Sequence, residues 1–244
     1  MQFTHRGSSD ESLSQGWGLG DVAIGIFASI FLSAIFASLI LTVAGWKSSS
    51  DTPIWGLALL QVPLWAGYLG AVFFAGSKGQ GVIADFGLRM RFFDAPLGLA
   101  LGVACQLAVL PLIYAPIFFL TGTDATELSK PAEQLAGRAD GKLSWLLFAL
   151  LVGVLAPVVE ELFYRGLFLK SLEKRRLPAW AAVVLSSFIF AGMHFQALQF
   201  PGLLVVGLTA GTLAVVTGRL GPAIWLHIGF NMTTVVALFM KLGP

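Results

Sequence analysis

Long apolar runs separated by short polar segments dominate the chain from residue 21 onward. A helix that crosses the hydrocarbon core of a bilayer needs about 20 apolar residues. A membrane β-barrel would instead show alternating segments of about ten residues. The pattern therefore predicts an all-α, polytopic transmembrane helical bundle of about seven spans. The runs that reach or approach the required length cover residues 21–46, 54–76, 95–120, 143–169, 179–196, 200–217 and 221–240.

The fifth and sixth runs are short, and only residues 197–199 separate them. They fit either a tight helical hairpin or two partly re-entrant helices that are buried in protein. The expected number of spans is therefore six to eight.

Composition agrees with a membrane protein, because 57% of the 244 residues are hydrophobic and only 11% are charged. Soluble domains contain about 45–50% apolar and about 25% charged residues. The expected partner is thus the lipid bilayer, and a net charge of +2 gives no reason to expect nucleic acid. The single cysteine, Cys105, excludes a disulfide within the chain.

Residues 1–20 are polar, and the apolar run that follows is too long for the core of a cleaved signal peptide. We expect residues 1–20 to form a cytoplasmic N-terminal tail. With the N-terminus inside, the inner segments hold nine Lys and Arg residues and the outer segments hold five. An excess of these residues marks the cytoplasmic side, so the pattern favours this orientation.

The longest polar stretch between apolar runs covers residues 121–142. Asp124 and Glu127 have the spacing of a capping box, and residues 131–138 could form a short surface helix. The segment fits an ordered connecting loop, with a substrate-gating lid as the alternative.

Three ionisable groups, Glu160, Glu161 and Arg165, lie inside the fourth apolar run. Each charge there costs about 2.5–3.5 kcal/mol on insertion scales, and such residues usually mark a functional site. Glu161 and Arg165 are four residues apart, so they meet on one helix face and can neutralise each other. Glu160 points about 100° away. It is left as a free carboxylate, and burial suits such a group to proton exchange.

Two of the three histidines, His194 and His227, also lie in apolar runs. Phe190 precedes His194 by four residues and Asn231 follows His227 by four, so each pair shares a helix face. Asn231 can orient His227 or a substrate, or donate a hydrogen bond to an oxyanion.

The resulting candidate site, drawn from three helices, supplies the parts for water activation and amide hydrolysis. One or both histidines would bind a metal or stabilise the tetrahedral oxyanion directly. A catalytic zinc usually has three protein ligands, but the zinc-protease motif His-Glu-x-x-His is absent, so zinc (Zn) stays an open alternative. The candidate catalytic residues are Glu160, Glu161, Arg165, His194, His227 and Asn231, and the candidate metal ligands are Glu160, His194 and His227.

The depth of these groups is uneven. Glu160, His227 and His194 lie about 15, 9 and 22 Å from the ends of their runs that should be cytoplasmic. We expect the fourth helix to continue past Lys170 and the fifth span to be shifted, which would bring the three groups together near the cytoplasmic side.

Each of these residues alone also has a structural explanation. A histidine in an apolar span is commonly a hydrogen-bonded structural residue, and Glu161 with Arg165 can be a structural ion pair. A buried Glu-Glu-Arg set could also relay protons in a transporter. A transporter predicts internal repeats, and this cluster has no counterpart in residues 20–120.

Three motifs in order give a stronger indication than any single residue: Glu160-Glu161-x-x-x-Arg165, Phe190-x-x-x-His194 and His227-x-x-x-Asn231. Together they resemble the motif set of the CAAX protease and bacteriocin-processing (CPBP, or ABI) family. This family of intramembrane endopeptidases includes the type II CAAX prenyl endopeptidases. The resemblance covers about residues 143–240.

The resemblance implies that Glu160 is the catalytic glutamate and that His194, His227 and Asn231 help to form the site. Members of the family have been described both as metalloproteases and as glutamate-dependent proteases. Their substrates range from prenylated C-terminal peptides to bacterial peptides, and some members serve in bacteriocin self-immunity.

We therefore expect an intramembrane endopeptidase that hydrolyses a peptide or prenylated peptide near the cytoplasmic membrane face with a Glu-activated water. The alternative is a non-catalytic membrane adaptor or bacteriocin self-immunity protein with the same fold. The expected division is an N-terminal tail (1–20), N-terminal transmembrane helices and loop (21–142), and a catalytic transmembrane core (143–244). The sequence does not indicate an oligomeric state.

Overall fold

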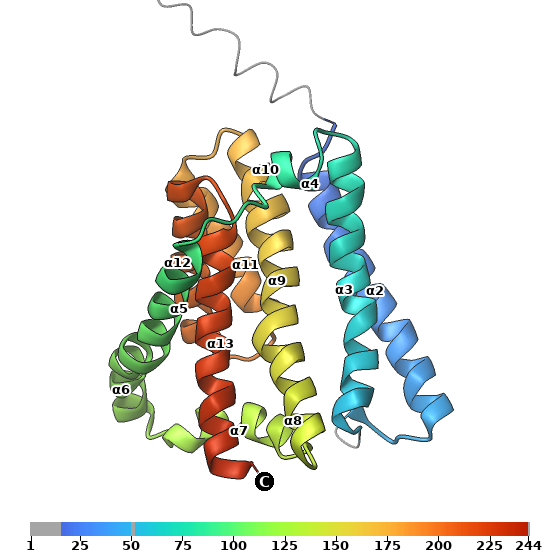
Figure 1. The fold of residues 1–244 in the computed structure, drawn as a ribbon, viewed down its shortest axis with the longest axis vertical. Coiled ribbons are helices and arrows are strands. Elements are labelled where there is room, and N and C mark those ends of the chain that lie inside the picture. Colours follow the sequence, from blue (N-terminus) through green and yellow to red (C-terminus); the bar gives the residue numbers. More distant parts are fainter. Residues whose placement is uncertain (1–15, 50–51, 244) are drawn as a thin grey trace, which may run out of the picture.

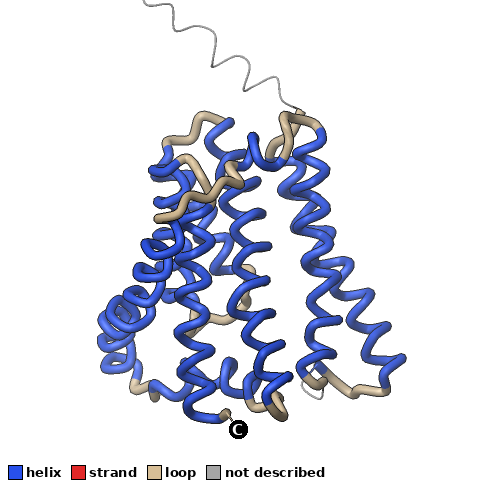
Figure 2. The backbone as a smooth tube through the Cα atoms, viewed as in Figure 1, coloured by secondary structure: helices blue, strands red, loops and turns tan. Residues whose placement is uncertain are grey.

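The computed structural model describes residues 16–49 and 52–243, so most of the expected tail lies outside the described residues. Within these ranges the chain forms helices and no strands, as Figure 2 shows. Six helices are long and apolar enough to cross a membrane, and a seventh apolar helix is shorter. The predicted all-α bundle is thus confirmed, and the chain is an integral, multi-pass membrane protein.

The spans agree closely with the predicted runs. Two long spans contain π-helical stretches, here labelled η. The first three spans and the short helix between the second and third are α2 (Leu19–Ala44), α3 (Ile54–Ser77), α4 (Val82–Phe86), and the continuous α5 (Asp94–Ala104), η2 (Cys105–Val109) and α6 (Leu110–Thr121). The rest are α7 (Ala125–Ala136), the continuous α8 (Lys142–Phe148), η3 (Ala149–Leu155), α9 (Ala156–Glu161), η4 (Leu162–Phe168) and α10 (Leu169–Lys174), then α11 (Ala179–Gly192), α12 (Phe200–Thr217) and α13 (Gly221–Leu242).

Two opposite ends of the bundle are distinguishable in Figure 1. The N-terminal face holds residues 16–18, residues 78–93 with α4, residues 169–178 with α10, and the connection between α12 and α13. The α7 face holds the connection between α2 and α3, residues 125–142 with α7, and the C-terminal end of α13. These two names are used below.

Helix α7 begins earlier than predicted. Asp124 is its N-cap and accepts a hydrogen bond from the backbone N–H of Thr126, which lowers the pKa of Asp124. The helix therefore starts at Ala125 and includes Pro131, where the expected surface helix was to begin. Its polar and apolar residues lie on opposite faces, as expected for a helix at a membrane surface.

Two glycines, Gly98 and Gly207, lie where helices pack closely. A Cβ atom at Gly98 of α5 would lie 2.5 Å from the Cβ of Trp225 on α13. A Cβ atom at Gly207 of α12 would lie 2.8 Å from the Cβ of Ser187 on α11. Because neither position has room for a side chain, glycine allows these backbones to approach as helices in lipid commonly do.

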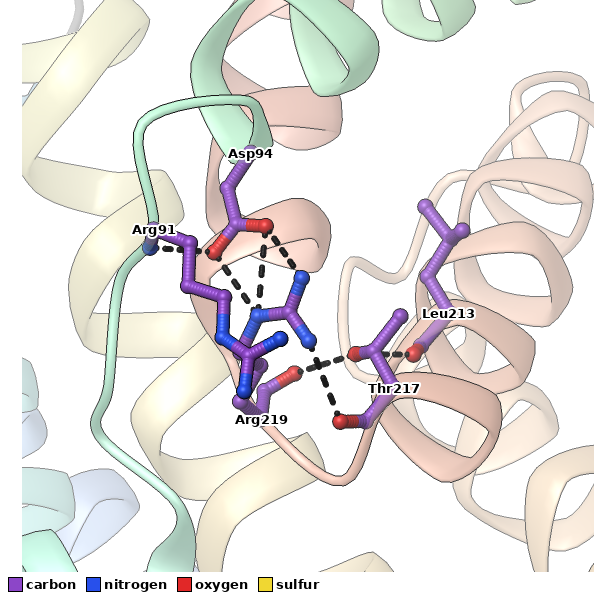
Figure 3. A network of polar contacts seen from close by, with 5 residues as sticks. All are labelled: Arg91, Asp94, Leu213, Thr217 and Arg219. Carbon is purple, nitrogen blue, oxygen red and sulfur yellow. Dashed lines mark hydrogen bonds and ion pairs between the residues drawn. The ribbon is translucent and has the colours of Figure 1, made fainter.

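An ion pair between Asp94 and Arg219 links the start of α5 to the connection between α12 and α13. Figure 3 shows Arg219 donating to both carboxylate oxygens of Asp94, at 2.6–3.2 Å. The Asp94 carboxylate is buried and raises the pKa of Arg219. The backbone N–H of Arg91 donates to the same carboxylate at 2.8 Å, so the connection before α5 is held as well.

Helices α11 and α12 form a hairpin. α11 has 14 residues, and residues 193–199, which connect it to α12, lie at a level between the two faces (Figures 1 and 2). Non-helical backbone at membrane depth is tolerated where protein buries it or where it lines a water-filled cavity. We call residues 193–199 the apex loop. The helices on either side of it pack together as a hairpin, and re-entry into the membrane stays a prediction.

Tyr114 of α6 holds the apex loop. Its hydroxyl donates to the carbonyl of Leu198 at 2.8 Å and accepts from the N–H of Gly202 at 3.1 Å. The Gln199 side chain donates to the carbonyl of Leu128 on α7 at 3.1 Å. The loop is thus bonded on both sides, which satisfies polar groups that lipid could not.

Candidate active site

The fourth span positions the two glutamates between π-helical stretches. η3 precedes α9, which carries Glu160 and Glu161, and η4 follows it with Arg165. Short π-helical insertions widen a helix by one residue per turn and occur frequently at functional sites. As expected, the helix continues past Lys170, and it ends at Lys174.

Glu161 joins two basic groups in the bundle interior. One of its carboxylate oxygens accepts a hydrogen bond from Arg165 Nη1 at 2.9 Å. The same oxygen lies 2.9 Å from His227 Nδ1. The side chains of Glu161 and Arg165 are fully buried and that of His227 is 4% exposed. The expected Glu161–Arg165 contact is present, while the contact with His227, 66 positions away, was not expected.

The contact with Glu161 fixes the orientation of the His227 ring. An ionised carboxylate can only accept hydrogen bonds, so we assign the ring hydrogen of His227 to Nδ1. The other ring nitrogen, Nε2, faces Glu160 Oε2 at 3.8 Å. This separation exceeds a direct hydrogen bond and is one that water commonly bridges.

Glu160 is the carboxylate that meets open space. Its side chain is 15% exposed and lines a cavity inside the bundle, whereas Glu161 and Arg165 do not line it. The contacts that helix geometry predicted are therefore present, since Glu161 pairs with Arg165 while Glu160 points elsewhere and lines the cavity; the roles of the two glutamates stay predictions.

His194 lies in the apex loop and not in the predicted span 179–196, because α11 ends at Gly192. Its Nδ1 lies 2.8 Å from the carbonyl of Phe190, which can only accept, so Nε2 is the nitrogen without a hydrogen in the neutral ring. His194 lines the same cavity as Glu160.

Phe190 is the apolar centre of the site. Its ring lies edge-on to the rings of His194, His227 and Tyr164, at centroid distances of 4.8, 5.6 and 5.3 Å. The guanidinium of Arg165 lies 4.5 Å from its centroid, which is a cation–π contact. Phe190 is fully buried and fixes the positions of both histidines.

Asn231 does not bond to His227 among the described residues. It donates instead to the carbonyl of Val152 in η3 at 2.8 Å. The N–H of Ala156 bonds to the carbonyl of Leu151, five residues earlier. In this register Val152 would pair with residue 157, but Pro157 has no N–H. Asn231 supplies the missing donor and keeps its remaining polar capacity for the cavity that it lines.

The cavity that joins these groups has a volume of about 630 Å³. Its polar lining includes the four expected residues Glu160, His194, His227 and Asn231. The other lining residues are Ser49, Ile54, Leu57, Leu60, Gln61, Trp65, Leu128, Pro131, Ala132, Leu135, Phe148, Leu151, Val152, Ala156, Gln196, Gln199, Leu203 and Thr234. Most of them are apolar, and they come from α3, α7, the fourth span, the apex loop, α12 and α13.

The direction of access differs from the sequence expectation. We expected the catalytic groups near the end that holds Lys170, which is part of the N-terminal face. Among the described residues, the cavity lining includes α7 and the connection before α3 and nothing from the N-terminal face. Hydropathy gives the depth of a group along its own helix, but it does not show which end of the bundle is hollow.

Sequence reasoning missed the tyrosines. The hydroxyl groups of Tyr68 and Tyr164 are 2.8 Å apart and buried beside the site, and Tyr114 holds the apex loop. The chain has three tyrosines, and all of them lie inside apolar runs. A hydroxyl at membrane depth needs a partner, so their positions were the available signal.

The expected zinc site is not assembled by the described residues. No group of three His, Cys, Asp or Glu side chains among them is arranged to hold a metal ion. His194 Nδ1 and His227 Nδ1 are occupied by Phe190 and Glu161. We therefore derive no step through a metal, and zinc stays a prediction.

The segment of the chain that matches a known protein family contains the residues of this site. Residues 142–233 match the model of a family described as type II CAAX prenyl endopeptidase Rce1-like. An uncharacterised 24.3 kDa protein of Escherichia coli is 28% identical over 145 residues, which is 57% of this chain. The match spans 64% of the length of that relative. No solved structure matches.

Proposed function

We propose, from the match of residues 142–233 to the Rce1-like family model of type II CAAX prenyl endopeptidases, that the chain is an intramembrane endopeptidase. It hydrolyses a peptide bond with a water molecule activated by Glu160. The observation that carries the proposal is the single cavity inside the bundle that Glu160, His194, His227 and Asn231 line together.

Glu160 acts as the general base. A water molecule between Glu160 and the free Nε2 of His194 loses a proton to the carboxylate as its oxygen attacks the carbonyl carbon. The C–O bond forms and the carbonyl oxygen becomes an oxyanion. Glu160 then returns the proton to the amide nitrogen as the C–N bond breaks, which releases a carboxylic acid and an amine.

His227 and Asn231 stabilise the oxyanion. With Nδ1–H donated to Glu161, a protonated His227 presents Nε2–H to the cavity, and the Glu161 carboxylate stabilises that imidazolium. The Asn231 side chain has a second amide hydrogen beyond the one that it donates to Val152. Removal of one oxyanion donor typically costs about 10²–10³ in kcat.

The test is proteolysis by the purified protein in lipid vesicles, with unstructured peptides and C-terminally prenylated peptides as substrates. Glu160→Gln and His227→Ala should each lower kcat by about 10²-fold or more. Glu173→Gln, on the same span but at the N-terminal face, is the matched control and should cleave like wild type. Equal cleavage by all four proteins would rule out the proposal.

The role of zinc is tested separately. The residues with free donor atoms at the cavity are Glu160 and the Nε2 atoms of His194 and His227. Cleavage is measured after thorough chelation and again after zinc is restored. Loss followed by recovery would assign a metal to the mechanism, and unchanged cleavage would assign water activation to Glu160 without zinc.

A further inference from the structure

The cavity is a shaft that enters the bundle from the α7 face. On α3 its lining runs from Ile54, the first residue of the helix, to Trp65, and on the fourth span it runs from Phe148 to Glu160. At about 1.5 Å per residue, each wall is about 16–18 Å long. Ser49 and Pro131, which line the shaft at the α7 face, are exposed.

The other end of the shaft is closed by packed side chains. A hydrophobic cluster fills the bundle between Glu160 and the N-terminal face. Phe86, Phe163 and Leu167 in this cluster are fully buried, and the Trp17 ring packs edge-on to Phe86 at 5.0 Å. The described residues also form a pocket at the N-terminal face, lined by Trp17, Asp21, Lys78 and Lys174 among others, and it shares no lining residue with the shaft.

Basic residues are distributed unequally between the two faces. Among the described residues, eight lie in the segments of the N-terminal face: Lys78, Arg89, Arg91, Lys170, Lys174, Arg175, Arg176 and Arg219. Five lie in the segments of the α7 face: Lys47, Lys130, Arg138, Lys142 and Lys241. Lys and Arg in short connections accumulate on the cytoplasmic side, so the N-terminal face is the side that this rule assigns to the cytoplasm.

The shaft has no lining residue from the N-terminal face, and it includes the exposed Ser49 and Pro131 at the α7 face. From this lining and the charge distribution, we propose that the cavity opens on the side of the membrane away from the cytoplasm. The inference rests on the proposed function and names its substrate class. The substrate is an unfolded polypeptide segment presented on the outer side, such as part of an exported peptide or an outward loop of a membrane protein. This differs from the cytoplasmic site that the sequence led us to expect.

The depth of the shaft sets a length requirement. An extended chain advances about 3.3–3.6 Å per residue, so about five residues are needed to span 16–18 Å. A cavity of about 630 Å³ is of the size that holds a drug-sized ligand and cannot admit a folded domain. The scissile bond must therefore lie at least about five residues from any folded part of the substrate, and apolar side chains should be favoured along the shaft.

Cysteine accessibility tests the direction of the opening without any need for proteolysis. In a Cys105→Ala background the chain lacks cysteine, and three reporters are added singly: Gln134→Cys on α7, Thr234→Cys in the cavity, and Gln80→Cys at the N-terminal face. A membrane-impermeant maleimide should label Gln134→Cys and Thr234→Cys in intact cells, and Gln80→Cys only after permeabilisation. Labelling of Gln80→Cys in intact cells, or protection of Thr234→Cys, overturns the proposal.

A spacing series tests the depth. An unstructured peptide that the purified protein cleaves and Glu160→Gln does not is fused to a compact folded domain at increasing distances from the scissile bond. Cleavage should fall at least tenfold when the linker is shorter than about five residues. Equal cleavage at every linker length overturns the deep-shaft substrate. Failure to cleave even the unfused peptide would count against the proposed function, while the labelling result would stand on its own.

Discussion

Glu161 connects two helices of the site, because one of its buried carboxylate oxygens contacts both Arg165 and His227. The helical half of this arrangement followed from the sequence, since residues four apart on a helix meet. The other half did not, because His227 comes from a distant helix and no local rule relates it to Glu161. Four of the polar residues that line the cavity were named from the sequence, whereas five others, among them Gln61 and Thr234, were not, and the partners of all of them depend on tertiary packing.

Glu161→Gln should destabilise the protein. It removes the negative charge beside Arg165, and loss of one partner from a buried ion pair typically costs about 3–5 kcal/mol. Unfolding in detergent measures the effect. Glu127→Gln, which breaks the exposed pair with Lys130, is the control and should change stability little. Equal stability of the two variants would contradict the central position of Glu161.

The bond from Asn231 to Val152 predicts a coupling with Pro157. Asn231→Ala should cost about 0.6–1.7 kcal/mol, the range of hydrogen bonds between membrane helices. Pro157→Ala restores a backbone N–H, so in that background the cost of Asn231→Ala should shrink. A double-mutant cycle on unfolding free energies measures this coupling. Pro63→Ala in α3 is the matched control, and an equal reduction there would reject the explanation.

At the scale of elements, hydropathy located the spans well because the bilayer fixes the length of an apolar helix. It failed at the end of α11. The apolar pattern continues through Phe195, Ala197 and Leu198 after the helix has ended, so it gave no sign of the apex loop. Phe195 has a positive φ of 53° and its N–H bonds to the carbonyl of Gly192 at 3.0 Å, a turn that the apolar pattern does not indicate.

Tyr114→Phe should release the apex loop. The change removes the hydroxyl that bonds Leu198 and Gly202, at an expected cost of about 1–2 kcal/mol. Hydrogen exchange of residues 193–199 should rise, and kcat should fall because His194 belongs to this loop. Phe118→Leu, which removes the ring stacked on Tyr114, is the control. Unchanged exchange in Tyr114→Phe would show that other contacts hold the loop.

At the scale of the whole molecule, the expected boundary near residue 142 does not separate the site from the rest of the bundle. The wall opposite Glu160 comes from α3, through Leu57, Leu60, Gln61 and Trp65. The family match begins at residue 142, so this wall lies outside it. The sequence could not show the contribution, because apolar residues that line a cavity resemble those that face lipid.

Leu60→Trp should obstruct the shaft while leaving the catalytic groups in place. The larger side chain enters open space, so we expect kcat/KM for peptide cleavage to fall by about tenfold or more. Leu59→Trp is the matched control, since Leu59 is 47% exposed on the outer surface of the same helix and does not line the cavity. Similar kinetics in the two variants would contradict the assignment of the α3 wall.

The α3 wall has an evolutionary consequence. Part of the cavity wall lies outside the stretch that carries the candidate catalytic groups, so this part can diverge while those groups are inherited unchanged. Related proteins could keep the same glutamate, histidines and asparagine and still cut different targets if the residues of α3 that line the cavity were substituted. Transplanting α3 between two relatives should therefore move preference for a target with it.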